Sequence, residues 1–417
     1  MSKLCINGGR RLCGELTVQG AKNSVLPLLA AAVLCDGESV IHNCPDLSDV
    51  SATVQILQHL GCSCKREDNT LIVNAKNLNR YDIPDILMRE MRSSIVLLGA
   101  LVGRTGKAVL SSPGGCEIGP RPIDLHISAL KQMGISIEEN HGFLDCSCPR
   151  GLFGANIHLS FPSVGATENI ILAATKALGK TVIHNAAREP EIIDLQNFIN
   201  EAGGCVSGAG SDKIEIHGVK KLFGTEHTVI PDRIVAATYM GAAAITGGEI
   251  SLKNTVPSHM VAVCNEFSVM GCSIAETGDT LYLKAPKRLN RFPAVKTMVY
   301  PGFPTDAGPI VAALACLANG TSVFVENIFE SRFKYIDELR RLGAKATVAE
   351  RVAVIEGVDS LSGAVVKSTD LRGGAALVLA ALAANGHTTV EKTCYIDRGY
   401  ECIEENLRYL GADIKRV

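Results

Sequence analysis

Basic residues recur at one kind of place in this 417-residue sequence, the start of a predicted helix. The N-terminus of a helix already carries the positive end of its dipole. A cationic side chain there is therefore unfavourable unless an anion binds to both the helix end and the side chain. Any one of these residues could instead form a salt bridge on a solvated surface. As a set they favour a site for highly anionic ligands. The set comprises Lys22, Arg92, Arg121, Arg332, Arg372 and Arg398.

A loop over residues 111–126, SSPGGCEIGPRPIDLH, places a thiol among residues that break regular structure. Its three prolines and three glycines exclude helix and strand, and such a composition is typical of lids that exclude water on closing. Cys116 lies in its middle and is expected to be accessible, which makes it a candidate for an active thiol. Arg121 should lower the pKa of that thiol and Glu117 should raise it, so its protonation state stays open.

Two aspartates lie at the starts of apolar helices. Asp370, in STDLR, is expected to cap its helix, and such a cap stabilises a helix by about 1 kcal/mol. Capping would suffice for Asp306, in GFPTDAG, as well. Because that helix end is expected to face the anion site, Asp306 is also a candidate for the chemistry.

Composition argues against several other classes. The charge is nearly balanced at −2, aromatic residues make up 5% and tryptophan is absent, which disfavours nucleic-acid binding. No apolar run approaches the roughly 18 residues of a membrane span. The fifteen cysteines contain no CxxC pair and the histidines have no ligand spacing, so no metal is predicted. No export signal is visible, so the thiols are expected to be reduced in the cytosol.

The elements that position these residues form a repeat. Glycines that separate a small-residue helix from a β-branched strand recur about every 70 residues, and so do glycines that end a second helix. The pattern predicts six repeats of helix, strand, helix, strand and strand. The first helix of each is apolar on nearly every side, which predicts buried helices with sheets outside. The two glycine sets are Gly37, Gly106, Gly179, Gly248, Gly320, Gly386, and Gly61, Gly134, Gly203, Gly271, Gly343, Gly411.

Six repeats divide naturally into two domains of three. The segment 4–20 resembles the segment 214–230, and the last repeat ends without such a segment, so residues 1–21 are expected to complete the sixth repeat. The predicted N-terminal domain is 22–230, with the loop 111–126, and the predicted C-terminal domain is 1–21 with 231–417. The active site is expected in the cleft between them.

These motifs together resemble the UDP-N-acetylglucosamine 1-carboxyvinyltransferases, a family of enolpyruvyl transferases. The matching strings are GAKN, PGGCEIGPRPIDLH, SVGAT, NAAREPEI, PDRI, FPTD, DLR and YIDRGYE, along essentially the whole chain. The resemblance implies two inside-out α/β barrel domains and no cofactor. It also implies transfer of the enolpyruvyl group of phosphoenolpyruvate to the 3′-hydroxyl of UDP-N-acetylglucosamine, with release of phosphate through a tetrahedral ketal, in the first committed step of peptidoglycan synthesis.

The resemblance also implies roles at matching positions. Lys22, Arg121 and Arg398 would bind the phosphate of phosphoenolpyruvate, Arg332 and Arg372 its carboxylate, and Asn23 both substrates. Cys116 would protonate the methylene carbon or attack C2, and Asp306 would take the proton of the sugar hydroxyl. The residues implied in catalysis are Cys116, Asp306, Lys22 and Arg398. The implied nucleotide-sugar site comprises Asn23, Arg92, Arg121, Pro122, Ile123, Asp124, Leu125, Ser163, Val164, Gly165, Asp306 and Ile328.

Two positions depart from the family's pattern: Phe161 stands where some members have a lysine, and Val96 where some have a tryptophan. The cysteine in the loop predicts alkylation of Cys116 by fosfomycin. The alternatives are a transferase acting on shikimate 3-phosphate, a non-catalytic relative that binds the sugar nucleotide, and a nucleic-acid-binding repeat protein. No nucleic acid, membrane or obligate protein partner is expected.

Overall fold

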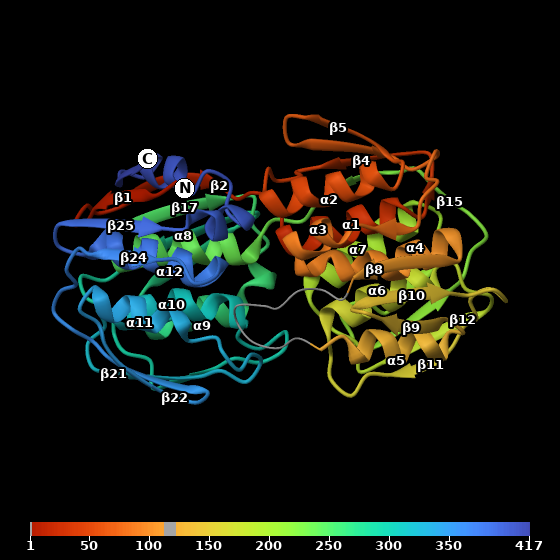
Figure 1. Cartoon of the computed structure of the whole chain (residues 1–417). Coiled ribbons are helices and arrows are strands. Elements are labelled where there is room, and N and C mark those ends of the chain that lie inside the picture. The colour runs from red at the N-terminus through yellow and green to blue at the C-terminus, as the bar shows by residue number, and fades with distance from the viewer. Residues whose placement is uncertain (1, 112–121) are drawn as a thin grey trace. The chain divides into compact units, whose positions relative to one another are not determined.

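The computed structural model describes residues 2–111 and 122–417, apart from the side chain of Arg92. The described chain divides into two compact units (Figure 1). The C-terminal unit contains residues 2–19 and 231–417, and the N-terminal unit contains residues 20–111 and 122–230. Each unit has a hydrophobic core of its own.

Among the described residues, six four-stranded sheets follow the sixfold repeat, three in each unit. In each sheet the strand after the first helix pairs in parallel with an edge strand and antiparallel with a further strand. The sheets of the N-terminal unit are β16 (Glu226–Thr228), β4 (Glu38–His42), β6 (Thr70–Asn74), β5 (Ser63–Glu67); β7 (Asp82–Ile83), β8 (Lys107–Ser111), β10 (Phe143–Ser147), β9 (Ser136–Asn140); and β11 (Asn156–His158), β12 (Lys180–His184), β14 (Lys213–His217), β13 (Val206–Ser207). Those of the C-terminal unit are β2 (Cys13–Thr17), β17 (Glu249–Lys253), β19 (Thr280–Lys284), β18 (Ser273–Thr277); β20 (Ala294–Lys296), β21 (Thr321–Val325), β23 (Val352–Glu356), β22 (Lys345–Ala349); and β24 (Val365–Lys367), β25 (His387–Glu391), β1 (Leu4–Asn7), β26 (Asp413–Arg416).

The first strand of the chain supplies the strand that the sixth repeat lacks. β1 lies between β25 and β26 and is antiparallel to both, with Leu4 opposite Val390 and Arg416. β2, the next strand, pairs in parallel with β17 in the sheet of the fourth repeat. The N-terminal segment therefore joins the sheets of two repeats within the C-terminal unit.

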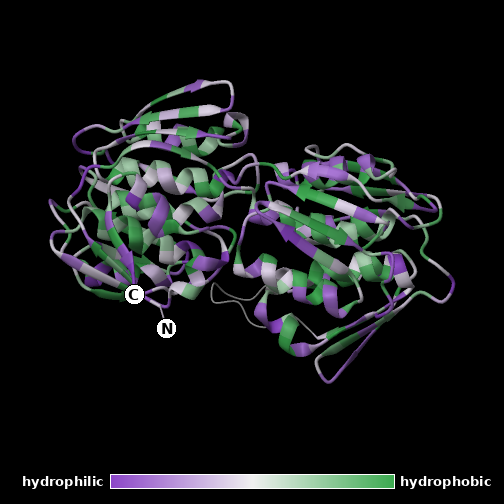
Figure 2. Ribbon diagram, turned by 90° about the horizontal axis from the view of Figure 1, so that it is seen from above, coloured by the Kyte–Doolittle hydropathy of each residue, from purple (hydrophilic) through white to green (hydrophobic). Residues whose placement is uncertain are grey.

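The first helices of the repeats form the centre of each unit, as predicted. Nearly every residue in them is buried, and the three helices of a unit contact one another. In Figure 2 hydrophobic residues predominate along these helices, while the strands alternate between hydrophobic and hydrophilic. The predicted fold class, buried helices surrounded by sheets, is confirmed. The helices are α1 (Lys22–Ala32), α4 (Leu97–Thr105), α6 (Val164–Ala174), α8 (Arg233–Ile245), α10 (Gly308–Ala315) and α12 (Leu371–Ala383).

The second helices end at the glycines that the repeat predicts. Each of these six glycines has a φ between 91° and 104°, a left-handed conformation that glycine adopts without strain. The other glycine set contains an exception at Gly248, because the left-handed residue there is Gly247. A Cβ on Gly248 would lie 1.9 Å from the carbonyl oxygen of Leu12, so close backbone approach requires that glycine. The second helices are α2 (Ser48–His59), α5 (Asp124–Gln132), α7 (Pro190–Glu201), α9 (Val261–Val269), α11 (Lys334–Arg341) and α13 (Ile403–Tyr409).

Short elements complete the described chain. Residues 35–36 and 222–223 are two short strands that pair in parallel. The remaining helical segments are α3 (Asp85–Glu90) and the 3₁₀ helices η1 (Arg92–Val96), η2 (Pro257–His259), η3 (Thr305–Ala307) and η4 (Thr393–Arg398). No helix among the described residues is both long and apolar enough to cross a bilayer.

Candidate functional site

Three predicted site residues meet in the C-terminal unit, and we call them the guanidinium cluster: Arg332, Arg372 and Asp306. Arg332 precedes α11, Arg372 is the second residue of α12, and Asp306 lies in η3. Nη2 of Arg332 is 3.1 Å from Oδ1 of Asp306, and Nε of Arg372 is 3.6 Å from Oδ2. Both arginines are almost fully buried, whereas the Asp306 side chain is 28% exposed.

The guanidinium cluster has more hydrogen-bond donors than acceptors. Nη2 of Arg332 donates to the carbonyl of Thr305 and to Asp306. Nε of Arg332 and all three nitrogens of Arg372 make no hydrogen bond to a described residue. Because a buried guanidinium without acceptors is unfavourable, these nitrogens are suited to the oxygens of an anion, which they could bind in a fork geometry.

The ring of Tyr400 holds Arg372 from one side. The guanidinium carbon lies 5.2 Å from the ring centroid, a cation–π contact, and the Tyr400 hydroxyl is 2.8 Å from Oγ1 of Thr238. Burial by itself would lower the pKa of Arg372, but Tyr400 and Asp306 raise that pKa above its ordinary value. The side chain therefore stays positively charged. The sequence interpretation missed Tyr400, although it stands inside the YIDRGYE string.

The two aspartates at helix starts have different functions. Asp370 caps α12, since its Oδ1 accepts hydrogen bonds from the backbone N–H groups of Arg372 and Gly373 at 3.1 and 3.0 Å. The capping prediction for Asp370 is confirmed, and the same Oδ1 lies 3.5 Å from Nη1 of Arg332. Asp306 is in the first turn of η3, whose N-cap residue is Pro304, and its carboxylate contacts the two arginines instead.

In the N-terminal unit, Lys22 begins α1 as predicted and forms a buried ion pair. Its Nζ lies 2.7 Å from Oδ2 of Asp49 in α2, and the two residues are 7% and 3% exposed. Asn23, the next residue, is exposed. Lys22, which is predicted to bind phosphate, thus already has a carboxylate partner in Asp49. The sequence interpretation did not find this partner.

A second buried polar network lies next to Lys22 and Asn23. The Ser24 hydroxyl donates to Oδ2 of Asp194 in α7. Oδ1 of Asp194 is 2.9 Å from Nε2 of His227, whose Nδ1 is 2.6 Å from Oε2 of Glu201. Burial lowers the pKa of His227, but the two carboxylates outweigh it and raise that pKa above its ordinary value. The two carboxylates therefore stabilise the charged form of this histidine relative to a free imidazole.

The residues implied for the nucleotide sugar lie at the starts of helical elements. Pro122 and Ile123 precede α5, which begins with Asp124 and Leu125. Ser163 caps α6, its Oγ accepting from the N–H of Ala166 at 3.3 Å, and Val164 and Gly165 form the first turn. Such a helix N-terminus can bind phosphate oxygens.

Ile328 lies in the loop before α11, in the C-terminal unit. Its backbone N–H donates to Oε1 of Glu326, a fully buried carboxylate that also accepts from Thr297 and Thr305. Because Thr305 directly precedes Asp306, one buried carboxylate holds the backbone at two predicted site residues.

The structure corrects one predicted helix start and refines another. Arg398 is the last residue of η4 and does not begin the second helix of its repeat, because the chain turns through Cys402 at φ 44° before α13 starts. Arg92 begins the 3₁₀ helix η1, and α4 starts only at Leu97. Of the predicted lid 111–126, residues 112–121, which include Cys116 and Arg121, lie outside the described residues, as does the side chain of Arg92. Its two ends are regular structure, against the prediction, because Ser111 completes the ladder of β8 and residues 124–126 form the first turn of α5.

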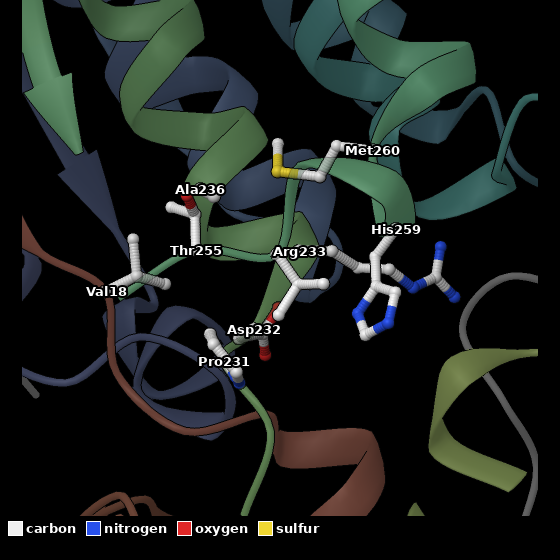
Figure 3. A pocket seen from close by; sticks show the side chains of 9 residues that line it. Val18, Pro231, Asp232, Arg233, Ala236, Thr255, His259 and Met260 are labelled. Atoms are coloured by element: carbon white, nitrogen blue, oxygen red, sulfur yellow. The ribbon is translucent and has the colours of Figure 1, made fainter. Parts of the chain in front are cut away.

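One pocket near the start of α8 can be set aside (Figure 3). Its lining includes Asp232, Arg233, Thr255 and His259, and none of the predicted site residues. It has essentially no space that a water molecule could occupy, whereas ligand pockets measure roughly 300–1,000 Å³. Within residues 2–111 and 122–417 there is also no group of three or more ligating side chains that could hold a metal ion.

Comparisons with known proteins identify the family and the fold. The family model described as EPSP synthase (3-phosphoshikimate 1-carboxyvinyltransferase) matches residues 6–407. Among solved structures, the enolpyruvyl transferase NikO from Streptomyces tendae is similar with a TM-score of 0.89 and 26% identity, covering 100% of this chain and 99% of that one. EPSP synthase from Acinetobacter baumannii shares the fold, with a TM-score of 0.78 at 20% identity over 100% of both chains.

Sequence relatives are closer. The UDP-N-acetylglucosamine 1-carboxyvinyltransferase 2 of Caldanaerobacter subterraneus subsp. tengcongensis is 52% identical over 100% of both chains. The UDP-N-acetylglucosamine 1-carboxyvinyltransferase 1 of Symbiobacterium thermophilum is 52% identical over 99% of this chain and 94% of its own. The chain is therefore an enzyme that belongs to the UDP-N-acetylglucosamine 1-carboxyvinyltransferase family of enolpyruvyl transferases.

Proposed function

We propose that this enzyme transfers the enolpyruvyl group of phosphoenolpyruvate to the 3′-hydroxyl of UDP-N-acetylglucosamine and releases phosphate, as a cytosolic step of peptidoglycan synthesis. The observation that carries the proposal is the guanidinium cluster, in which buried donors without acceptors surround a partly exposed carboxylate. It is supported by 52% identity over the full length to relatives that bear this activity in their names.

In the proposed reaction the carboxylate of phosphoenolpyruvate accepts hydrogen bonds from Arg332 and Arg372. Two guanidiniums suit this task because they present planar forks that match a carboxylate. Lys22 and Arg398, together with Arg121, bind the phosphate, and Asn23 contacts both substrates. Lys22 would then bind phosphate while Asp49 remains close to it, so the phosphate must compete with or share that ion pair.

Proton transfer is assigned to two residues. Asp306 accepts the proton of the sugar hydroxyl as its oxygen attacks C2 of phosphoenolpyruvate, and Cys116 protonates the methylene carbon or attacks C2 itself. The C–O bond to phosphate then breaks with its electron pair on the phosphate, and the methyl group formed in the addition returns a proton to the Cys116 thiolate, which restores the double bond in the product. Asp306 is suited to this task because its carboxylate is partly exposed and lies beside the two arginines assigned to phosphoenolpyruvate.

The nucleotide sugar is assigned to segments that begin helical elements. Arg92 begins η1, Pro122 and Ile123 precede α5, and Asp124 and Leu125 begin it. Ser163 caps α6, and Val164 and Gly165 begin that helix. Arg121, which lies outside the described residues, is assigned with them. Backbone N–H groups at the start of α6 are suited to the diphosphate. Ile328, held by Glu326, completes the set.

The test is phosphate release from phosphoenolpyruvate, with UDP-N-acetylglucosamine and with shikimate 3-phosphate as parallel acceptors. The second acceptor is included because the matching family model is described by that substrate. We expect release only with the sugar nucleotide, and loss of release in Cys116→Ala. Phosphate release only with shikimate 3-phosphate would overturn the assignment of UDP-N-acetylglucosamine as the acceptor. Binding of the sugar nucleotide without phosphate release would favour a non-catalytic relative.

Fosfomycin supplies an independent test of the thiol. Mass spectrometry of the wild-type enzyme with UDP-N-acetylglucosamine present should show one added fosfomycin on Cys116, because an accessible thiolate opens an epoxide. Absence of that adduct would contradict the assignment of Cys116.

A further inference from the structure

Three elements of the N-terminal unit carry residues that the proposed function assigns to the nucleotide sugar. Arg92 begins η1, Asp124 begins α5 and Ser163 caps α6. These elements are far apart in the sequence, and the described structure joins them through one fully buried side chain, Asn169 in the second turn of α6.

Asn169 uses both ends of its amide to make these connections. Its Oδ1 accepts a hydrogen bond of 2.7 Å from the backbone N–H of Gly99 in α4, directly after η1. Its Nδ2 donates to the carbonyl of Ile95 in η1 at 2.9 Å and lies 2.7 Å from Nδ1 of His126 in α5. One amide in the core thus ties η1 and α5 to the helix that Ser163 begins.

The two backbone contacts also fix the orientation of the amide. Gly99 offers a donor and Ile95 an acceptor, so Oδ1 must face the first and Nδ2 the second. Nδ2 consequently presents its other hydrogen to His126, and Nδ1 of that ring must accept it. An imidazole that accepts at Nδ1 is neutral and carries its proton on Nε2.

The His126 ring packs directly against the start of α6. A Cβ placed on Gly165 would lie 3.1 Å from Cε1 and 3.4 Å from Nε2 of that ring. The ring, itself 6% exposed, therefore sets how closely α5 approaches the first turn of α6.

We propose that Asn169 and His126 are positioning residues that hold these three helical starts in the geometry required by UDP-N-acetylglucosamine. The inference rests on the proposed function. Neither residue needs to touch the substrate. Loss of the amide leaves the buried groups of Gly99, Ile95 and His126 without their partner, so the three starts can shift relative to one another.

The test compares KM values for the two substrates in Asn169→Ala. We expect the KM for UDP-N-acetylglucosamine to rise at least about tenfold, with the KM for phosphoenolpyruvate, at saturating sugar nucleotide, within about twofold of wild type. The matched control is Thr175→Val, which removes a buried hydroxyl at the other end of α6 that donates to Ile171. It should leave both KM values unchanged.

A second measurement takes its main result from the wild-type protein. In ¹⁵N-histidine-labelled wild-type protein, with the signal assigned by its loss in His126→Gln, His126 should be neutral with its proton on Nε2 near pH 7. In Asn169→Asp the carboxylate oxygen should instead draw a proton to Nδ1.

These results separate the two proposals. A proton on Nδ1 in the wild type, or a folded Asn169→Ala with an unchanged KM for the sugar nucleotide, would overturn the positioning role. If the wild type releases no phosphate, the proposed function fails instead. Calorimetry of UDP-N-acetylglucosamine binding to wild type and Asn169→Ala then decides the positioning role by itself, with weaker binding to the variant expected.

Discussion

The buried cations of the predicted site have different partners in the two units. In the N-terminal unit Lys22 is paired with Asp49 at 2.7 Å, and His227 lies between Asp194 and Glu201. In the C-terminal unit Arg332 and Arg372 share Asp306, and four of their nitrogens make no hydrogen bond to described residues. Lys22 and His227 thus have carboxylate partners in their own unit, whereas the guanidinium cluster has buried donors without an acceptor among the described residues.

This difference shows that a basic residue at a helix start can either pair with a carboxylate of the chain or remain without a hydrogen-bond acceptor. Equivalent positions in the six repeats carry Lys22 and Arg372, yet Lys22 pairs with Asp49 of the next helix and the nitrogens of Arg372 make no hydrogen bond to a described residue. We infer that phosphoenolpyruvate binds with its carboxylate on groups that are already in place, and with its phosphate on a lysine that must loosen an existing pair.

The largest expected effect follows from the carboxylate within the guanidinium cluster. Asp306→Asn should lower kcat by about 10²- to 10⁴-fold, because an amide cannot accept the proton of the sugar hydroxyl. Steady-state kinetics measure this, with the exposed Asp337→Asn in α11 as a control that should behave as wild type. A kcat within a few-fold of wild type would remove Asp306 from the chemistry.

The paired lysine predicts a loss of stability. Asp49→Asn leaves the buried ammonium of Lys22 without that carboxylate and should lower the free energy of unfolding by about 3–5 kcal/mol. Urea unfolding measures the change. Added phosphate should recover more stability in the variant than in the wild type, since it can occupy the place of the carboxylate. An equal effect of phosphate on both would show that Lys22 does not bind it.

The aromatic contact on Arg372 predicts a smaller effect. Tyr400→Leu removes a cation–π contact of about 0.5–2 kcal/mol and should raise the KM for phosphoenolpyruvate by about 2- to 30-fold. Tyr400→Phe keeps the ring and should stay near wild type. If Tyr400→Phe raises the KM as much as Tyr400→Leu, the effect comes from loss of the hydroxyl that contacts Thr238, and the cation–π contact does not contribute to binding.

The smallest expected effect concerns pH and the N-terminal unit. Because the pKa of His227 is raised in the folded state, the stability it contributes is fully present below the pKa of an unfolded histidine. That stability is lost as pH rises through the higher folded pKa. The difference in unfolding free energy between wild type and His227→Gln should therefore be largest in mild acid and shrink above neutrality. A difference that grows with pH would mean that the two carboxylates do not charge this histidine.

The sequence predicted the fold well because its signals are local and repeated. Glycines at helix ends and apolar first helices recur six times, and each copy strengthens the others. The prediction for Arg398 was wrong because a helix boundary depends on one backbone conformation, the left-handed Cys402, which residue type does not reveal.

The site could be predicted only in part. Arg332, Arg372 and Asp306 each stand at a predicted helix start, so their meeting follows from the repeat. Asp49, Tyr400 and Asn169 act through partners from other segments, which spacing along the chain does not show. One signal was available: Glu168 and Asn169 are adjacent polar residues inside an otherwise apolar helix, and a buried polar side chain requires a partner.

The most direct test of this account is to replace Arg372 by methionine and to measure unfolding of the free protein and the KM for phosphoenolpyruvate. If Arg372 is held for an anion, the free energy of unfolding should change by less than about 1 kcal/mol, since Arg332 still pairs with Asp306. The KM should then rise by about 10²-fold. A protein destabilised by about 3 kcal/mol or more with an unchanged KM would contradict the account, because Arg372 would then be a structural charge.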